Sequence, residues 1–496
     1  MKPTLAIALL ASVADAASHV VNETTCGGHT YKYTGLAGYG FIPSDATDKF
    51  GDTIGGIGSS AAIDQWSWRK NTNGTLNYQA RIHKFGLTLE INHKASAKYP
   101  SQPNLRLKYL DTILLTGPDG QPTTGLDADA IGAASYPGFP PLPVATYTGD
   151  GFGDPGRGGK RISIDAEGLA LARDGGFWVS DEYGPYTYKF SASGRMELAI
   201  QPPQAYLPRR NGTVSFSADS PPLYDPFKMP NPEDTGSGRN NNQGFEGLTM
   251  SPDGKTLYTL IQSSLDQEGG PDKQNRQPAR MLAYDISSKT PRYLHEWVVM
   301  LPRYIDYTSK HANKANKVAS QSEIHQLPTG DFLILSRDSG FGHGQDESRS
   351  VYRQADIFSV LNNASVTDFK GQSDYDSATG AIASTKGILK AGINPAEYCS
   401  FLDFNVTSEL AKFGLHNGGP QDQYLLNEKW ESLAVVPVHP SKNGRRKQGE
   451  QEYFLFSLSD NDFITQNGRL NSGKLSYKDA SGYNVDTQAL VFKIQF

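Results

Sequence analysis

Acidic residues recur at the start of four similar segments of the chain. The four acids, spaced by 79, 77 and 108 residues, are Glu167, Glu246, Glu323 and Glu431. Further aspartates that follow later in the same segments are Asp181, Asp460 and Asp462. Carboxylate and amide oxygens are the ligands that Ca²⁺ prefers, and Mg²⁺ and Mn²⁺ are the less suited alternatives. The pattern therefore predicts a cation, Ca²⁺ in the first place, bound by acids from several segments.

Other side chains close to these acids in the sequence could take part in catalysis. The candidates are His343, His325, Arg337, Arg280 and Asp338. His343 lies in a glycine-rich loop and His325 follows the third repeated acid by two residues, so either could move a proton. Arg337 and Arg280 could hold an anionic group through paired hydrogen bonds. The alternative is that the histidines are structural and that the arginines pair with Asp or Glu.

Each repeated segment has the pattern of two strands joined by a tight turn. The turns contain Asp174-Gly175, Asp253-Gly254 and Thr329-Gly330, which are hairpin signals. Outer strands are expected at 186–190, 281–286, 356–360 and 489–494, and upstream strands at 54–63, 80–91 and 106–116. A short helix is expected at 394–398 because Pro395 would occupy its first turn.

Repeated hairpins with outer strands predict an all-β fold, a β-propeller. The four clear units and one or two upstream units predict five or six blades, with six favoured. Spacings of 77 residues or more exceed the roughly 40–50 residues of one blade, so long insertions must separate the strands. A two-sheet sandwich is the structural alternative, but it does not explain an acid ahead of each first strand.

Propeller geometry would bring the acids together at one end of the central channel. The first strand of each blade lines the channel and the second runs antiparallel to it. The residues that should meet are Glu167 with Asp181-Glu182, Glu246 with Gln262, Glu323 with Arg337-Asp338, and Glu431 with Asp460 and Asp462. Crowded carboxylates raise one another's pKa, and a bound cation removes that penalty. In the alternative, each Glu caps a blade by accepting backbone N–H groups, without a metal.

The chain begins with the features of an export signal. Lys2 is followed by an apolar run from Leu5 to Val13 and by Ala14-Asp15-Ala16, a small-residue cleavage pattern. We expect residues 1–17 to be a signal peptide, 18–50 an N-terminal segment and 51–496 the propeller domain of a secreted protein. Five Asn-x-Ser/Thr sequons, which are expected glycan sites in an exported chain, are Asn22, Asn73, Asn211, Asn363 and Asn405.

Cysteine content and charge limit the other possibilities. The 496 residues include two cysteines, Cys26 and Cys399, and we expect them to form one disulfide in an oxidising compartment; two separate thiols are the alternative. The formal net charge of −5 gives no general attraction to nucleic acid or to an anionic membrane. No later apolar run is long enough to cross a bilayer. For the oligomeric state, a monomer is favoured.

Several motifs resemble the family described as esterase-like activity of phytase, or phytase-like, and most closely its fungal secreted members. The motifs are EGLALARDGGFWVSDEYGPYTYKF, GFEGLTMSPDGKTLYTLIQSSL, LSRDSGFGHG, KWESLAVV with FSLSDND, GGIGSSAAID and GTLNYQARIHKF. The resemblance extends from about Asp52 to Phe496. One departure is the segment from Asp64 to Asn71, where an Asp-Arg-Gly turn would be expected and where the first blade could be shortened.

The resemblance implies a propeller and an ester-hydrolysing activity. The Glu-Gly-Leu motif with its Asp-Gly hairpin is also similar to calcium propellers of the gluconolactonase and paraoxonase type, which again points to the four repeated glutamates. The protein is expected to be a secreted, Ca²⁺-dependent hydrolase of small anionic esters, and phosphoric esters are the expected substrates. The alternatives are a carboxylic-ester or lactone hydrolase, and a non-catalytic propeller that binds a glycan or a protein and contains structural calcium.

Overall fold

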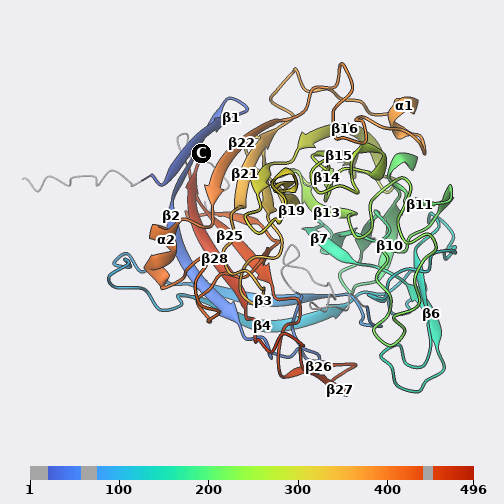
Figure 1. Cartoon of the computed structure of the whole chain (residues 1–496), viewed down its shortest axis with the longest axis horizontal. Coiled ribbons are helices and arrows are strands. Elements are labelled where there is room, and N and C mark those ends of the chain that lie inside the picture. Colours follow the sequence, from blue (N-terminus) through green and yellow to red (C-terminus); the bar gives the residue numbers. More distant parts are fainter. Residues whose placement is uncertain (1–19, 57–74, 440–450) are drawn as a thin grey trace, which may run out of the picture.

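The apolar stretches beside the repeated acids form strands of antiparallel sheets. The computed structural model describes residues 20–56, 75–439 and 451–496. Four large sheets lie around a central axis in a propeller-like ring (Figure 1). Three of them have four strands in sequence order: β7 (Ala166–Leu171), β8 (Phe177–Asp181), β9 (Thr187–Phe190) and β10 (Met196–Ile200); β13 (Phe245–Met250), β14 (Thr256–Ile261), β15 (Pro278–Asp285) and β16 (Arg292–Met300); β19 (Ser320–Gln326), β20 (Phe332–Arg337), β21 (Arg353–Ser359) and β22 (Glu397–Asp403).

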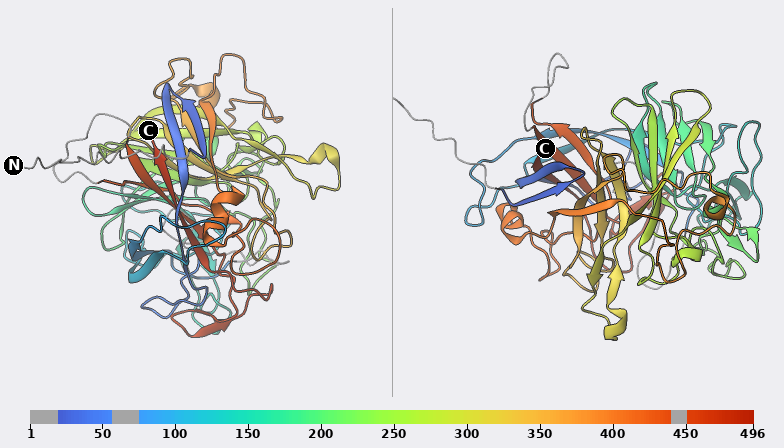
Figure 2. Two further views of the ribbon diagram at one scale, coloured as in Figure 1. Left: turned by 90° about the vertical axis from the view of Figure 1, so that its left-hand side faces the viewer. Right: turned by 90° about the horizontal axis from the view of Figure 1, so that it is seen from above.

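The fourth sheet closes the ring by joining the two ends of the chain. Its strands are β1 (Asn22–Cys26), β2 (His29–Ile42), β28 (Thr487–Gln495), β25 (Glu452–Asp460), β23 (Lys429–Trp430) and β24 (Ala434–Pro437). Strand β2 pairs with the last strand, β28, so strands from the two ends of the chain lie side by side (Figure 2). The expected N-terminal segment 18–50 therefore supplies two strands to the propeller.

The remaining strands form two-stranded sheets between or outside the large ones. They are β3 (Arg81–Leu89) with β4 (Leu105–Leu114), β5 (Val144–Tyr147) with β6 (Gly159–Ile162), β11 (Arg209–Arg210) with β12 (Thr213–Val214), β17 (Arg303–Ile305) with β18 (Asn316–Val318), and β26 (Gly468–Leu470) with β27 (Leu475–Tyr477). Among the described residues, four sheets have four or more strands. The expectation of five or six blades is therefore not confirmed.

The β3–β4 pair bridges the ring between β2 and β10. Just before β4, the Asn104 side chain accepts a hydrogen bond from Tyr39 N at 2.9 Å and donates one to Ala37 O at 3.0 Å. Just after β4, Thr116 forms a β-bridge with Arg195, next to β10. Two of the three strands expected upstream are thus present, whereas the structure has no strand over residues 54–56 and the rest of the third lies outside the described residues.

The hairpin turns form as expected, and the expected helix does not. Gly175, Gly254 and Gly330 have φ values of 83°, 63° and 95°, which explains the glycine at each turn. The segment at 394–398 instead leads into β22, where Tyr398 pairs with Phe358 of β21. Pairing with a neighbouring strand therefore outweighs the local helix signal. The helices of the described residues are short: α1 (Ser373–Asp376), α2 (Thr407–Leu410), η2 (Gln204–Tyr206), η3 (Asp266–Glu268), η4 (Ala312–Lys314) and η5 (Ala411–Phe413).

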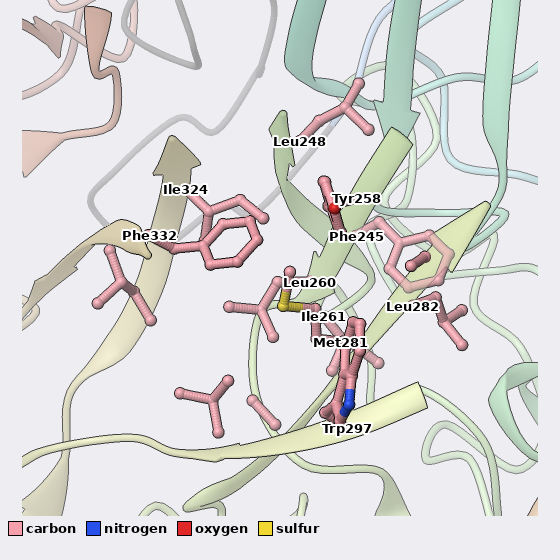
Figure 3. Close-up of a cluster of buried hydrophobic side chains, with 14 of the residues drawn as sticks. Phe245, Leu248, Tyr258, Leu260, Ile261, Met281, Leu282, Trp297, Ile324 and Phe332 are labelled. Atoms are coloured by element: carbon pink, nitrogen blue, oxygen red, sulfur yellow. The ribbon is translucent and has the colours of Figure 1, made fainter. Parts of the chain in front are cut away.

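Apolar faces of neighbouring sheets pack together and hold the blades at fixed positions. The largest cluster joins the β13–β16 sheet to the β19–β22 sheet (Figure 3). The Phe332 ring lies 5.0 Å from the Tyr258 ring in an edge-on contact and stacks on the Phe358 ring at 5.0 Å. Buried aromatic pairs of this kind stabilise by about 0.5–1.5 kcal/mol beyond the area that they bury.

One of the covalent predictions is confirmed. Cys26 of β1 and Cys399 of β22 form a disulfide across 373 residues, so the bond ties the closing sheet to the adjacent blade. No helix among the described residues is long and apolar enough to cross a membrane.

Glycosylation stays a prediction. Asn22 and Asn211 are exposed, while Asn363 and Asn405 are partly buried. The signal peptide, Asn73 and Asp64–Asn71 lie outside the described residues.

Candidate functional site

A β-bulge recurs near the start of three inner strands, β7, β13 and β19. In β13, Phe245 pairs with Ile261 but Gly247 pairs with Leu260, which leaves Glu246 as the extra residue. The pairing shifts at the same point of β7 and of β19. A bulge breaks the alternation of side chains and redirects the extra residue. The bulge is therefore the local feature that turns the acid away from regular strand packing.

The third copy of the repeat is offset by one residue from the alignment expected from the sequence. Glu167 and Glu246 each precede the glycine of their hairpin turn by eight residues. In β19, the residue eight positions before the turn glycine is Ser322, and this is the bulged residue. Glu323 thus occupies the position that Gly168 has in β7. The equivalent acids are three rather than four.

The glycine after the acid allows neighbouring inner strands to approach closely. A Cβ atom on Gly168 would lie 2.4 Å from Leu248 Cβ and 2.6 Å from Glu246 O of the next blade. A Cβ on Gly247 would lie 2.9 Å from Gln321 Oε1 of the blade after that. The Glu-Gly pair therefore combines a redirected acid with a close contact between blades.

Three acids of the first blade form the tightest group at this end of the channel. Asp165, Glu167 and Glu182 are buried, and one carboxylate oxygen from each lies within 4.8 Å of the other two. Burial raises the pKa of Glu167 well above its ordinary value, and the charges of Glu246, Glu182, Asp165 and Glu431 raise it further. Acids from three different blades thus influence one carboxyl group.

The second strands end in polar residues at the same place, as expected from propeller geometry. The Gln262 amide donates a hydrogen bond to Glu246 Oε1. Burial, followed by the charge of Glu431, raises the pKa of Glu246 to about 8. Burial, followed by the charge of Asp462, raises the pKa of Asp460 to about 8. In both cases the charged form is destabilised mainly by loss of solvent.

Basic side chains approach the acids from the third and fourth blades. Arg337 Nη2 lies 2.6 Å from Glu431 Oε1, and Lys429 Nζ lies 2.8 Å from Asp462 Oδ1. Arg239 is fully buried and donates to the carbonyl oxygens of Tyr183 and other residues. Burial raises the pKa of Glu182 well above its ordinary value, and the charge of Arg239 opposes that rise. The name acid cluster is used below for Lys429 and Arg337 together with seven acids at this end of the channel: Asp165, Glu167, Glu182, Glu246, Glu431, Asp460 and Asp462.

Glu323 fits the capping alternative better than a ligand role. Its Oε1 accepts hydrogen bonds from Leu248 N at 3.0 Å and from Ile324 N at 2.8 Å. It therefore connects the β13 and β19 strands across the wall of the channel. Burial is the main cause that raises its pKa, and Glu246 makes the smallest contribution.

Asp181 and Asp338 hold turns instead of facing the acid cluster. Asp181 accepts hydrogen bonds from the backbone of Asp165, Tyr183 and Gly184 and from the Tyr188 hydroxyl. Asp338 accepts hydrogen bonds from Ser350 Oγ and from the backbone of two following residues. The expected ligand role of Asp181 and the expected catalytic role of Asp338 are therefore not supported by the geometry.

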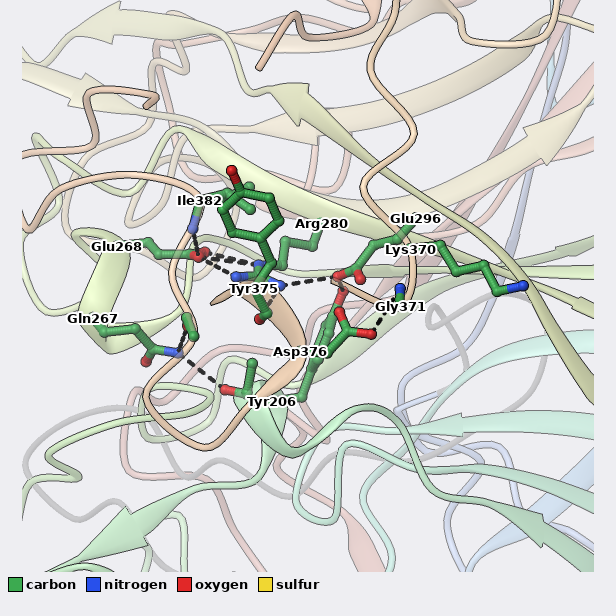
Figure 4. Close-up of polar contacts among 12 residues, drawn as sticks. Tyr206, Gln267, Glu268, Arg280, Glu296, Lys370, Gly371, Tyr375, Asp376 and Ile382 are labelled. Atoms are coloured by element: carbon green, nitrogen blue, oxygen red, sulfur yellow. Dashed lines mark hydrogen bonds and ion pairs between the residues drawn. The ribbon is translucent and has the colours of Figure 1, made fainter. Parts of the chain in front are cut away.

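Arg280 is a structural residue and does not face the channel. Its guanidinium is fully buried and bonds to both carboxylate oxygens of Glu268 and, at 3.0 Å, to Glu296 Oε1 (Figure 4). It also donates to Tyr375 O at 3.1 Å, in the loop that covers these strands. The ion-pair alternative thus holds for Arg280, whereas Arg337 belongs to the acid cluster.

The two histidines are placed differently from the catalytic expectation. Burial lowers the pKa of His325 to about 4, and no acid contributes to that shift. His343 is buried in the loop between β20 and β21, where its backbone forms a β-bridge with Asn427 and its ring meets the Tyr483 ring edge-on at 6.1 Å. Burial also lowers the pKa of His343. Asp422 of a neighbouring loop opposes this shift, and His416 of the same loop adds to it. Neither histidine shares a charge interaction with the acid cluster in these contacts.

Three members of the site were missed by sequence reasoning, namely Asp165, Lys429 and Arg239. Asp165 precedes Glu167 by two residues, and Lys429 precedes Glu431 by two residues. These positions are equivalent in the first and fourth blades, so a longer repeat alignment would have found them. Arg239 lies in an insertion and carries no repeat signal.

The donors of the acid cluster suit a hard divalent cation. Carboxylate and amide oxygens dominate the set, which fits Ca²⁺ and, with stricter geometry, Mg²⁺. Glu246 Oε2 and Asp460 Oδ2 are buried without a hydrogen-bond partner among the described residues. Buried acceptor atoms of this kind are costly unless an ion, a proton or water satisfies them.

Comparison with known proteins adds the family. The family model described as phytase-like, esterase-like activity of phytase, matches residues 73–463. The chain belongs to the phytase-like family. An uncharacterized secreted protein of Arthroderma benhamiae is 59% identical over 480 residues, which cover 93% of each chain.

Similarity to solved structures is weak. A luciferin-regenerating enzyme matches with a TM-score of 0.25 and 12% identity over 88% of this chain and 94% of its own. The periplasmic gluconolactonase of Pseudomonas aeruginosa matches with a TM-score of 0.20 and 11% identity over 84% and 98%. Scores at this level carry no argument about function.

Proposed function

We propose that this phytase-like protein is a secreted ester hydrolase whose active centre is the acid cluster. The observation that carries the proposal is the convergence of buried carboxylates from three blades, centred on Asp165, Glu167 and Glu182. Family membership supports ester hydrolysis, and the disulfide and the secreted relative support an extracellular protein.

A divalent cation, Ca²⁺ in the first place, is part of the proposal. Asp165, Glu167 and Glu182 would hold it, and the neighbouring Glu246 would complete the oxygen donors. When bound, such a cation polarises an ester oxygen and lowers the pKa of a bound water. The donor set supports this choice because it is rich in carboxylate oxygens.

The chain's own residues would bind the substrate and move the proton. Arg337 lies beside Glu431 and its side chain is 11% exposed, so it could orient an anionic group that reaches the cluster. Burial, followed by the charge of Asp462, raises the pKa of Asp460 to about 8, so its Oδ2 can hold a proton at neutral pH. A carboxyl group tuned close to the working pH is suited to general acid–base catalysis.

Phosphoric esters are the proposed substrates, and carboxylic esters or lactones are the second candidate. The phosphate assignment is supported by the family and by two cationic side chains in the cluster. The second candidate is favoured by the fact that Arg337 and Lys429 already bind carboxylates at 2.6 and 2.8 Å. A doubly charged phosphate would have to compete with these ion pairs.

Activity measurements with matched variants test the proposal. The secreted protein would be assayed with an aryl phosphate, an aryl acetate and a lactone, after chelation and after Ca²⁺ is restored. We expect hydrolysis of the phosphate to require Ca²⁺ and to fall at least about a hundredfold in Glu167→Gln, because the cation and its charge stabilisation are lost.

Glu323→Gln is the matched control, since it changes a buried glutamate of the same channel that binds backbone N–H groups. It should retain activity close to wild type. Faster turnover of the acetate or the lactone would identify the second candidate. If the Ca²⁺-loaded protein hydrolyses none of the three substrates, the proposed enzymatic function is contradicted. A non-catalytic propeller that binds a partner is then the remaining function.

A further inference from the structure

Lys429 lies among the acids on one side of the cluster. It begins β23, and its ammonium group is 2.8 Å from Asp462 Oδ1 and 3.9 Å from Glu431 Oε1. The side chain is 7% exposed. Its charge also lowers the pKa of Asp460, whose shift is caused first by burial. Lys429 therefore interacts with three carboxylates of the fourth blade.

The repeat shows that this lysine occupies a position where another blade has an acid. Lys429 precedes Glu431 by two residues, as Asp165 precedes Glu167. In the first blade the residue adds a carboxylate to the tight group of three acids. In the fourth blade it places a positive charge beside acids of the same cluster. The two sides of the cluster are therefore chemically different.

We propose that Lys429 is a built-in cation that fills the side formed by Glu431, Asp460 and Asp462, so that an exchangeable divalent cation binds only on the opposite side. This inference rests on the proposed function, because it concerns the cation of that same centre. It removes Glu431, Asp460 and Asp462 from the set of ligands expected from the sequence and keeps Glu167 and Glu246.

Charge and space both support this division. An ammonium group 2.8 Å from Asp462 Oδ1 occupies the volume that a second cation would need. Without it, the buried Asp462 and Glu431 would lose a counter-charge, and uncompensated buried charge is strongly unfavourable. A divalent ion from solution would then restore the balance. Glu246 Oε2, which is buried without a partner among the described residues, supports the presence of a cation beside the first blade.

The test is a calorimetric titration of Ca²⁺ into chelator-treated wild type and Lys429→Gln. We expect wild type to bind one Ca²⁺ per chain and the variant to bind two, or to bind one at least about tenfold more tightly, because one positive charge has been removed. Lys429→Arg keeps the charge and should retain the wild-type stoichiometry. Lys412→Gln is the matched control, because Lys412 pairs with the buried Glu409 at 2.7 Å, away from the cluster.

Each outcome separates this inference from the proposed function. Equal stoichiometry and affinity in wild type and Lys429→Gln would overturn the inference while leaving a Ca²⁺-dependent hydrolase intact. If only Lys429→Gln binds Ca²⁺, the result supports the inference and contradicts the proposal that the wild-type hydrolase contains a divalent cation. Absence of binding by both would overturn both proposals.

A folding defect in the variant would also be informative. If Lys429→Gln folds only when the medium contains Ca²⁺, the missing charge is being replaced by the ion, as proposed. If it fails to fold with or without Ca²⁺, the double variant Lys429→Gln/Asp462→Asn removes the unpaired charge as well. Recovery of folding in the double variant would support the counter-ion role, and continued failure would contradict it.

Discussion

Replacing Arg280 by methionine should destabilise the protein without changing how it binds a substrate. The guanidinium is fully buried and bonds to Glu268 and Glu296, which are themselves fully buried. Removing one member of a buried charge group leaves the others uncompensated, which costs about 3–5 kcal/mol. The same change also breaks the bond to Tyr375 O that holds the covering loop.

The expected shift in melting temperature follows from the size of the chain. Unfolding entropy is about 2.1 cal/mol/K per residue, or about 1 kcal/mol/K for a mature chain of about 480 residues. A loss of about 3–5 kcal/mol should therefore lower Tm by about 3–5 °C. Differential scanning calorimetry and steady-state kinetics on the same preparations measure both effects. The KM for the preferred ester should remain within about twofold of wild type, since Arg280 does not face the acid cluster.

Arg337→Met provides the comparison within the cluster. Because Arg337 binds Glu431 there, its loss should change KM or kcat as well as stability. A large rise in KM for Arg280→Met, with an unchanged Tm, would refute this reasoning and restore Arg280 as a substrate-binding residue.

Three further predictions concern packing, covalent closure and pH. Gly168→Ala should lower the free energy of unfolding by about 1–3 kcal/mol, because the added Cβ would lie 2.4 Å from Leu248 Cβ. Thermal unfolding measures this against the control Gly86→Ala, where the atom closest to the added Cβ is 3.7 Å away. Equal stabilities of the two variants would contradict the prediction. Replacing both Cys26 and Cys399 by serine should lower stability by up to about 6 kcal/mol in the chain-entropy account, and an unchanged Tm would count against that role. Burial raises the pKa of Asp356 to about 6, so the folded state binds this proton more tightly than the unfolded chain. The stabilisation of the folded state by the Asp356 proton is present below about pH 4 and is lost as the pH rises through about 6. In Asp356→Asn this loss should be absent, so its Tm relative to wild type should rise by about 2–3 °C between pH 4 and pH 7; parallel Tm curves for the two proteins would contradict the assignment.

Local patterns in the sequence were sufficient to predict the inner hairpins. The turns at Gly175, Gly254 and Gly330 need left-handed backbone, and alternating apolar residues mark the strands on either side. The pairing of β2 with β28 could not be predicted in this way. It joins residues about 445 to 463 positions apart, and nothing in either strand specifies its partner.

The site was predicted in outline because propeller geometry brings equivalent residues together. Glu167, Glu246 and Glu431 do influence one another's charge. The error at Glu323 came from aligning acids with acids rather than counting from the turn, where the bulged residue is Ser322. A one-residue shift changes which side chain is redirected, and only the pairing register reveals it.

The roles of buried charges were the least predictable part. Arg280 is followed by ordinary strand residues, and its partner Glu268 comes from η3, in an insertion between β14 and β15 of the same blade. Whether an arginine faces a channel or a buried carboxylate depends on the path of such insertions. Their sequences are polar and carry no period that would define that path.

The most direct test of the account is a crystal structure of the secreted protein grown with Mn²⁺ in place of Ca²⁺, with anomalous scattering recorded near the manganese absorption edge. Mn²⁺ also accepts carboxylate oxygens and reveals its own position. The account predicts one strong anomalous peak bounded by Asp165, Glu167 and Glu182, absent from crystals of Glu167→Gln and present in those of Glu323→Gln. Crystals saturated with Mn²⁺ that show no anomalous peak among these three carboxylates would contradict the proposed metal centre. A peak that is unaffected by Glu167→Gln would contradict it as well.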